Sequence, residues 1–445
     1  MTSLFASDAL LPNGWAKNVR IEVDPSGSIA SVTAQSSPEK SERLAGPVLP
    51  GMANLHSHAF QRAMAGLTEV RGSSNAVDDD FWSWRELMYR FLERLTPVQS
   101  QAIAAYLYID MLKHGYTAVG EFHYVHDGSG DMLLAHLAAA KETSIAITLL
   151  PSLYRWSNFG RQPLQPGQRR FESDPGFILK LLEKVRAHAS PDVVAGVAPH
   201  SLRAVDPAGL KELVQGLPTG PIHIHAAEQT KEIEDCIAAL GRRPVEWLLE
   251  NMNVDERWCL VHATHMTAEE TGALARSGAT AGLCPTTEGN LGDGIFPLLA
   301  YRAAGGRYGI GGDSHVSRDP AEELRLLEYA QRLTARRRNL VVGERSQAVG
   351  TTLWLEAAAG GRVLGRSMGA IAPGLRADLV VLDAEQPDLA GRSGDAIANA
   401  LIFSGATNLV RDVMAGGKWA VRERRHAQEE PARDAYVKAV AELLN

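Results

Sequence analysis

The chain has 445 residues, which exceeds one minimal domain and fits either one large barrel domain with an accessory domain or two to three smaller domains. Hydrophobic residues make up 45% of the chain and charged residues 22%, so a sizeable core is available. The net charge of −7 argues against a nucleic-acid-binding protein, because such a surface needs a basic patch.

The three cysteines, Cys236, Cys259 and Cys284, form no Cys-x-x-Cys pair. An odd count without such a pair disfavours a disulfide framework and favours a reducing cytosol. The first residues show no basic region followed by a long apolar stretch, and no segment reaches the ~18 apolar residues of a membrane span. We therefore expect a cytoplasmic protein with no membrane partner.

The two ends of the chain have a similar β-rich texture. Near the start, the alternation in "VRIEV" and the turn signal "DPSGS" predict a hairpin. Near the end, "GLRADLVVLDAEQPDL" and "VRDVMAGGKWAV" are also typical of strands joined by turns. We expect residues 1–48 and 371–445 to build one small β-sandwich domain, with a terminal helix at the end of the second segment.

Residues 49–370 alternate between strands and helices. The predicted strands, in chain order, are "VLPGMANLH", "TAVGEFH", "SIAITLLPS", "DVVAGVAPH", "PIHIHAAE", "WCLVHATH", "ATAGLCP" and "RYGIGGD". Among the helices, "TAEETGALARSG" has Thr267 and Glu270 in a capping-box pattern and Gly278 as its stop. The pattern predicts an α/β fold, a (β/α)8 TIM barrel. A doubly wound sheet is the alternative, disfavoured because no Gly-x-Gly-x-x-Gly turn follows the first strand.

Ionisable residues gather at the ends of these predicted strands. Catalytic groups of a (β/α)8 barrel lie at the carboxyl ends of its strands. Here those ends carry His56, His58, His123, His200, His225, His262 and Asp313. The distribution predicts an active site at that end of the barrel.

His56 and His58 are two residues apart, so in an extended strand both side chains point the same way. Two imidazoles from one strand can share one metal ion, although a pair of histidines in a polar loop is an equally good interpretation of this pair alone. His223 and His225 also share a face. We expect His225 to be the ligand because it is nearer the strand end, with Glu228 just beyond, and His223 to fill the barrel.

Asp313 follows two glycines, which leave room for close approach to a ligand, although an aspartate in this position is often only a turn residue. With three histidines it completes a metal site that leaves room for water. The predicted fourth strand contains no lysine that could bridge two ions. We therefore expect one divalent ion per chain, zinc first, with iron and manganese as alternatives.

A divalent ion makes hydroxide available near neutral pH, so the expected chemistry is hydrolysis at an sp² carbon. Asp313 can contact the metal and take a proton, Glu228 can deliver a proton to a leaving nitrogen, and His262 can polarise the electrophile.

The motifs "HSH", "HAAEQ", "VHATH" and "GGDSH", with "LRADLVVLD", resemble those of the amidohydrolase superfamily. Within it, "PGMANLHSHAFQRAMAG", "FWSWRELMYRF" and "APHSLRAV" are similar to the N-formimidoyl-L-glutamate deiminases. The resemblance implies hydrolytic deimination of N-formimino-L-glutamate to N-formyl-L-glutamate and ammonia, in bacterial histidine degradation. It also implies homodimers, although no sequence feature fixes an interface.

The resemblance further assigns roles to individual residues. A single zinc would be bound by His56, His58, His225 and Asp313, with Glu228 and His262 as acid/base residues. Contacts to the dicarboxylate substrate would come from Gln61, Arg85, Tyr124, His200 and Arg203.

Other interpretations of these contacts remain open. Arg85 can stack on neighbouring rings or pair with Glu86, Arg203 can pair with Asp206, and Gln61 can cap a loop. An aminohydrolase of a purine, pyrimidine or related ring is the second functional hypothesis, because it shares the metal residues but has less need of two arginines. A non-catalytic barrel is the third, and it is disfavoured because every metal and acid/base candidate is present.

Overall fold

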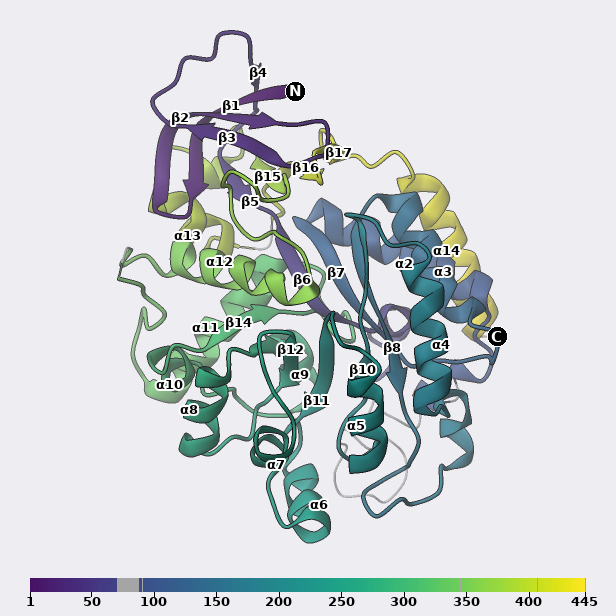
Figure 1. Ribbon diagram of the computed structural model, residues 1–445. Coiled ribbons are helices and arrows are strands. Elements are labelled where there is room, and N and C mark those ends of the chain that lie inside the picture. The colour runs from purple at the N-terminus through teal and green to yellow at the C-terminus, as the bar shows by residue number, and fades with distance from the viewer. Residues whose placement is uncertain (70–87, 90, 345, 406, 445) are drawn as a thin grey trace.

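The structure is a computed structural model that describes residues 1–69, 88–89, 91–344, 346–405 and 407–444. It contains two β-sheets, one in a small domain and one in a barrel surrounded by helices (Figure 1). The strands of the small domain come from both ends of the chain, while the barrel comes from the long middle.

The barrel has eight strand positions. They are occupied by β6 (Met52–Ser57), β7 (Tyr116–His123), β8 (Ala146–Leu153), β9 (Val193–Ala195) with β10 (Ala198–Pro199), β11 (Ile222–Ala226), β12 (Trp258–His262), β13 (Thr280–Leu283) and β14 (Arg307–Ile310). Neighbouring strands are parallel, β14 pairs with β6, and a bridge between Val197 and Ile222 closes the circle. The closed parallel order confirms the predicted (β/α)8 fold and excludes the doubly wound alternative.

Two predicted strands are each divided in the structure. "VLPGMANLH" separates at Gly51 into β5 (Val48–Pro50), which joins the small domain, and β6. A Cβ atom at Gly51 would lie 2.6 Å from the Thr117 side chain, so the crossing between the sheets requires glycine. "DVVAGVAPH" separates into β9 and β10 opposite Pro151 of β8, which has no N–H to donate to the ladder.

The small domain consists of one eight-stranded sheet. Besides β5 it contains β1 (Thr2–Leu11), β2 (Gly14–Val23), β3 (Ile29–Thr33), β4 (Glu42–Arg43), β15 (Leu379–Leu382), β16 (Val410–Ala415) and β17 (Lys418–Val421). The predicted hairpin is confirmed: β2 and β3 are antiparallel, and the Asp24 carboxylate accepts hydrogen bonds from the Ser26 and Ser28 amides at the turn. Apolar residues from both chain ends share its core, such as Leu4, Ile21 and Leu379.

Helices cover the outside of the barrel. They are α2 (Pro97–Lys113), α3 (Asp131–Thr143), α4 (Pro175–Arg186), α5 (Pro207–Gln215), α6 (Thr230–Leu240), α7 (Pro244–Asn251), α8 (Ala268–Ser277), α9 (Pro285–Leu291), α10 (Leu298–Ala303), α11 (Pro320–Ala335), α12 (Val349–Gly360), with α13 (Asp395–Phe403) and α14 (Glu429–Leu444) nearer the carboxyl end. Short segments of 3-10 helix lie at η1 (Ala59–Met64), η2 (Pro166–Phe171), η3 (Gly361–Leu364) and η4 (Pro387–Leu389). None of the described helices has the length and apolar composition that a membrane span requires.

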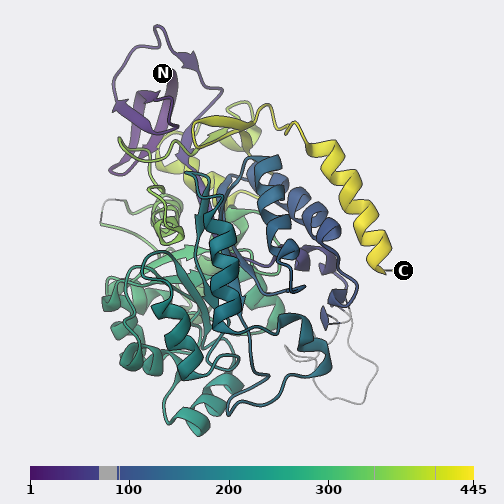
Figure 2. The same cartoon turned by 45° about the vertical axis from the view of Figure 1, so that its right-hand side comes forward.

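The predicted capping box of α8 is confirmed. The Thr267 hydroxyl accepts a hydrogen bond from the Glu270 amide at 3.2 Å, and the Glu270 carboxylate accepts one from the Thr267 amide at 2.8 Å. Gly278 ends the helix with a φ of 88°, which a residue with a side chain rarely adopts. At the other end of the chain, α14 lies along α2 on the flank of the barrel (Figure 2), where Tyr436 stacks on Tyr106.

The amino-terminal end of the barrel is filled by apolar side chains. Val363 and Leu364 of η3 pack in a buried cluster with Ala53, Ala118 and Ala146, which lie near the starts of their strands. The polar strand ends named above therefore lie at the opposite end of the barrel.

Candidate active site

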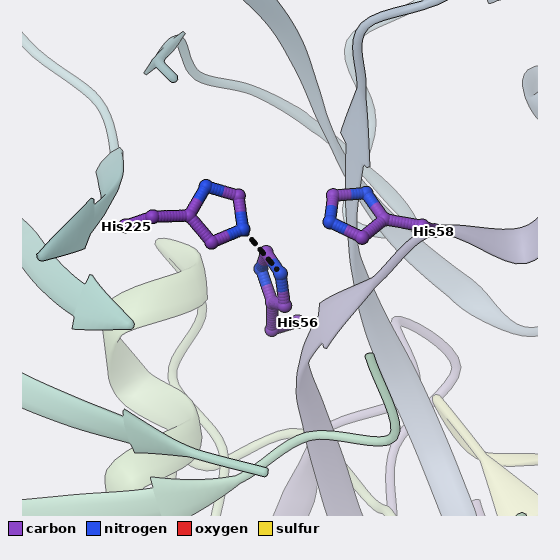
Figure 3. Close-up of side chains that lie close together, drawn as sticks. All are labelled: His56, His58 and His225. Atoms are coloured by element: carbon purple, nitrogen blue, oxygen red, sulfur yellow. Dashed lines mark hydrogen bonds between the residues drawn. The ribbon is translucent and has the colours of Figure 1, made fainter. Parts of the chain in front are cut away.

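Three histidines from two strands converge at the carboxyl end of the barrel. His56, His58 and His225 are buried, and each offers a ring nitrogen within 4.8 Å of the other two (Figure 3). The Nε2 atoms of His56 and His225 are 3.0 Å apart. The Asp313 carboxylate completes the group, with Oδ1 3.4 Å from Nε2 of His56 and 3.5 Å from Nε2 of His58.

Backbone carbonyl groups fix the tautomers of two of these histidines. Nδ1 of His58 donates to the Phe122 carbonyl at 2.8 Å, and Nδ1 of His225 donates to the His200 carbonyl at 2.9 Å. The proton of each ring is therefore on Nδ1, and the Nε2 lone pair faces the centre of the cluster. Burial is the main reason that the pKa of His58 falls to about 3 and that of His225 lies well below its usual value, so both rings are neutral.

This donor set suits a divalent ion. Neutral imidazole nitrogens with their lone pairs directed at one point, next to a carboxylate, are the ligands that zinc and related ions bind. The rings of the three histidines also contact one another, with centroids 4.5 to 5.5 Å apart. The observed arrangement therefore fits the metal site that the sequence predicts.

Backbone contacts hold Asp313 against the first strand. Its amide donates to the His56 carbonyl at 2.9 Å, and its carbonyl accepts from the His58 amide at 3.0 Å. A Cβ atom at the preceding Gly311 would lie 2.8 Å from the His56 amide nitrogen, so this close approach needs glycine. Asp313 itself has a φ of 48°, in the left-handed region that costs a residue with a side chain on the order of 1 kcal/mol.

Glu228 and His262 face each other beside this cluster. Oε1 of Glu228 is 3.6 Å from Nε2 of His262, which is also 3.8 Å from Oδ2 of Asp313. Burial opposes the charged form of His262, but the Glu228, Glu288 and Asp313 carboxylates outweigh it and raise the pKa of His262 to about 10. Burial raises the pKa of Glu228, which His262 and Arg203 oppose. A carboxyl group with a raised pKa next to a protonated imidazole is suited to proton transfer near neutral pH.

The segment that carries Glu228 has an unusual backbone. Ala227 has a φ of 53°, and the Glu232 carboxylate accepts the amides of Ala227 and Glu228 at 3.2 and 3.0 Å. His262, at the end of the next strand, has a φ of 65°. Non-glycine residues with a left-handed backbone therefore occur at three of the strand ends of this site. Such strained backbone conformations are common at active sites.

A cavity opens onto these groups. Its lining includes His58, Gln61, Tyr124, His200, Arg203, His225, Glu228 and Asp313. Among the described residues, every predicted site residue lines this cavity except His56 and His262, which contact its lining residues His225 and Glu228, while Arg85 lies outside the described residues. Gln61 donates to the Tyr124 hydroxyl at 2.9 Å, and its own buried Oε1 has no hydrogen-bond partner among the described residues.

The alternative role of Arg203, as a partner for Asp206, is not supported by the surroundings of Asp206. That carboxylate caps α5 and accepts hydrogen bonds from the Trp156 indole at 2.8 Å and from Arg161 at 3.3 Å. Arg203 lines the cavity instead, and it is 4% exposed.

Three aromatic residues that line the cavity were not predicted from the sequence. Tyr89, Tyr154 and Phe171 line the cavity, and the buried Gln168 amide donates to the hydroxyls of Tyr154 at 2.9 Å and Tyr89 at 3.2 Å. Tyr154 directly follows β8, so the strand-end rule that found the histidines could have found it. Tyr89, Gln168 and Phe171 come from connecting segments and carry no such signal.

A polar network lies beneath the His56–His58 strand end. The Ser57 hydroxyl donates to the buried Glu121 carboxylate at 2.6 Å and lies 2.8 Å from Nε2 of His315. Glu121 also accepts the Ala59 amide at 2.9 Å. These contacts fix the backbone on either side of His58.

Comparison with known proteins gives consistent matches over the whole chain. Residues 48–420 match the amidohydrolase family, and residues 1–46 match the family described as the N-terminal domain of formimidoylglutamate deiminase HutF. The formimidoylglutamate deiminase of Pseudomonas aeruginosa is 52% identical over 100% of both chains. The 8-oxoguanine deaminase of the same species is 29% identical, over 84% of this chain and 82% of its own.

Solved structures agree with these matches. An amidohydrolase from Brucella melitensis has a TM-score of 0.94 and 46% identity over 100% of both chains. A zinc-containing adenosine deaminase from Xanthomonas campestris has a TM-score of 0.81 over 99% of this chain and 98% of its own, but its 20% identity supports the fold alone. The chain therefore belongs to the metal-dependent amidohydrolase family and, within it, to the formimidoylglutamate deiminases.

Proposed function

We propose that the protein hydrolyses N-formimino-L-glutamate to N-formyl-L-glutamate and ammonia. The observation that carries the proposal is the presence of Arg203 and Glu228 in one cavity with the histidine cluster. The substrate needs both: a cation for its carboxylates, and a proton-transfer group for the nitrogen that leaves. The printed name of the relative that is 52% identical over the full length supports the same reaction.

The proposed metal ligands are His56, His58, His225 and Asp313. One ion per chain is proposed, with zinc as its identity, because the donor set is three imidazole nitrogens and one carboxylate. When bound, such an ion lowers the pKa of water and so supplies hydroxide near neutral pH.

The chain's own groups handle the protons in this proposal. Asp313 accepts a proton from the attacking water at a carboxylate oxygen, and His262 hydrogen-bonds to the reacting centre through Nε2. Glu228 transfers a proton to the amidine nitrogen, so that this nitrogen leaves as ammonia. The distances of 3.6 Å from His262 to Glu228 and 3.8 Å from His262 to Asp313 support this division, since all three groups face the same point.

Substrate binding is assigned to the remaining lining groups. The Arg203 guanidinium suits a carboxylate because it can donate two parallel hydrogen bonds. Gln61, whose Oε1 has no hydrogen-bond partner among the described residues, is suited to accept a hydrogen bond from the substrate's N–H groups, and Tyr124 and His200 are proposed as further contacts. Arg85 is proposed as a second carboxylate contact on the basis of the sequence resemblance.

The wider setting is also a proposal. Three unpaired cysteines support a reducing cytoplasm, and the acidic net charge supports a small-molecule substrate without a nucleic-acid partner. We place the enzyme in histidine degradation, as a homodimer, with residues 49–370 as the catalytic domain and residues 1–48 and 371–445 as the accessory domain.

Ammonia release from a matched panel tests the function. N-formimino-L-glutamate should be turned over at a kcat/KM of at least ~10⁴ M⁻¹ s⁻¹, in the ordinary range of enzymes for their own substrate. N-formiminoglycine, which lacks the side-chain carboxylate, should be poor. Guanine, cytosine and adenosine serve as the ring alternatives, and preference for any of them would replace the proposal with a ring aminohydrolase.

A further inference from the structure

Glu288 lies behind the cavity wall and contacts His262 from the side away from the substrate. Its Oε1 is 3.3 Å from Nδ1 of His262. The other ring nitrogen, Nε2, is the one that faces Glu228 and Asp313. Glu288 belongs to α9, whose neighbouring Thr287 lines the cavity, and Glu288 itself is 4% exposed.

The hydrogen-bond partner of one imidazole nitrogen determines the protonation and the direction of the other nitrogen. A carboxylate is only an acceptor, so Glu288 requires a proton on Nδ1 of His262 and fixes the plane of the ring. The direction of Nε2 thus depends on a contact from another element of the chain.

We propose that Glu288 is a positioning residue that keeps the proton on Nδ1 of His262 and holds the ring in the orientation in which Nε2 faces the reacting centre. The proposal rests on the role assigned to His262 in the proposed function. It adds a residue that no sequence motif singled out, because Glu288 is 26 positions away from His262 along the chain.

A purely structural role is the competing explanation. Oε1 of Glu288 also accepts the Cys284 amide at 2.9 Å, so the side chain could serve only to hold the turn between β13 and α9. Glu323 provides a matched control for that role. It is equally buried, comes from α11, and binds the same turn, accepting the Thr286 amide at 2.9 Å and the Thr286 hydroxyl at 2.6 Å.

The experiment compares Glu288→Gln with Glu323→Gln in the full-length, metal-loaded enzyme. Glutamine keeps the size of the side chain, but its amide can present either N–H or C=O to Nδ1, so the proton on Nδ1 and the orientation of the ring are no longer enforced. We expect kcat for N-formimino-L-glutamate to fall by about 10- to 100-fold in Glu288→Gln, with KM and metal content close to wild type. Glu323→Gln should keep kcat within about threefold of wild type.

A double variant separates the two explanations further. In the His262→Asn background, adding Glu288→Gln should change kcat by less than about twofold, because residues that act as a unit are not additive. Equal losses in Glu288→Gln and Glu323→Gln, or a full additional loss in the double variant, would overturn the positioning role. If Glu288→Gln does not fold, Glu288→Asp, which shortens the reach by one methylene, takes its place with the same expected direction.

An activity-independent measurement keeps this test separate from that of the proposed function. In ¹⁵N-histidine-labelled protein, the Nδ1–H signal that disappears in His262→Asn identifies His262. We expect Glu288→Gln to move or broaden that signal and Glu323→Gln to leave it in place. If the wild-type enzyme did not act on N-formimino-L-glutamate, the proposed function would fail, while an unmoved His262 signal in Glu288→Gln would overturn the positioning role itself.

Discussion

The Nε2 atoms of His56 and His225 lie 3.0 Å apart, although 169 positions separate the two residues along the chain. The Phe122 and His200 carbonyls hold the protons of His58 and His225 on Nδ1, so the Nε2 atoms of these two rings present lone pairs. Two nitrogens bound to one tetrahedral ion at 2.0–2.1 Å would be about 3.3 Å apart. The spacing is thus close to that of two ligands on one ion.

Metal content gives the first prediction. The purified protein should hold about one divalent ion per chain, measured by inductively coupled plasma mass spectrometry. A chelator should abolish turnover, and added zinc should restore it. Two tightly bound ions per chain would contradict a site built from three histidines and one aspartate.

Two histidines of the same strand provide a matched pair for the ligand assignment. His225→Asn should lose most of the bound metal, because a cluster nitrogen is removed. His223→Asn should retain the metal, since His223 lies deeper in the barrel and outside the cluster. Metal per folded chain is the measurement, and equal metal loss in both variants would mean that the effect is one of folding rather than of ligation.

Asp313→Asn should reduce kcat by ~100- to 10,000-fold, because the amide cannot accept the proton. Asparagine tolerates the left-handed backbone of this position, which has a φ of 48°, so the fold should persist. Circular dichroism and thermal unfolding check the fold, and steady-state kinetics check the loss. A variant with near wild-type kcat would remove Asp313 from the mechanism.

Arg203→Ala should lower kcat/KM for N-formimino-L-glutamate at least ~30-fold, because a buried charged contact to a carboxylate is lost. Arg161→Ala is the control: it removes a nearby arginine that is 62% exposed and pairs with Asp206 instead of lining the cavity. Its kinetics should match wild type. An unchanged kcat/KM in Arg203→Ala would move the carboxylate site elsewhere.

The capping box of α8 gives a prediction about stability. Thr267→Ala removes the acceptor for the Glu270 amide and should cost about 1 kcal/mol of folding free energy, which lowers Tm by roughly 1–3 °C. Thr267→Ser keeps the hydroxyl and should stay near wild type. Equal melting temperatures for the alanine and serine variants would show that the cap contributes nothing measurable.

Periodicity and strand-end position were sufficient to predict the barrel and the histidines that it brings together. The parity of His56 and His58, and the place of His225 and Asp313 at the ends of strand patterns, depend only on local sequence. The division of the fourth strand was not predicted, because it depends on Pro151 in the neighbouring strand, whose missing N–H matters only once the two strands are paired.

Contacts between residues that are far apart along the chain could not be predicted from local sequence patterns. Gln168 joins Tyr89 to Tyr154 through its side chain, and Glu288 reaches His262 from a helix after the next strand. Neither residue has a spacing that marks it, since their partners are set by packing and not by chain neighbours. The closed barrel is what makes these contacts possible.

The identity of the products tests the central claim most directly. Hydrolysis of N-formimino-L-glutamate can break the bond to the terminal nitrogen, giving N-formyl-L-glutamate and ammonia, or the bond to the glutamate nitrogen, giving L-glutamate and formamide. ¹³C NMR of the reaction with substrate labelled at the formimino carbon distinguishes them. We predict N-formyl-L-glutamate and ammonia in a 1:1 ratio; formamide as the labelled product, or no consumption of substrate by the zinc-loaded enzyme, would contradict the account.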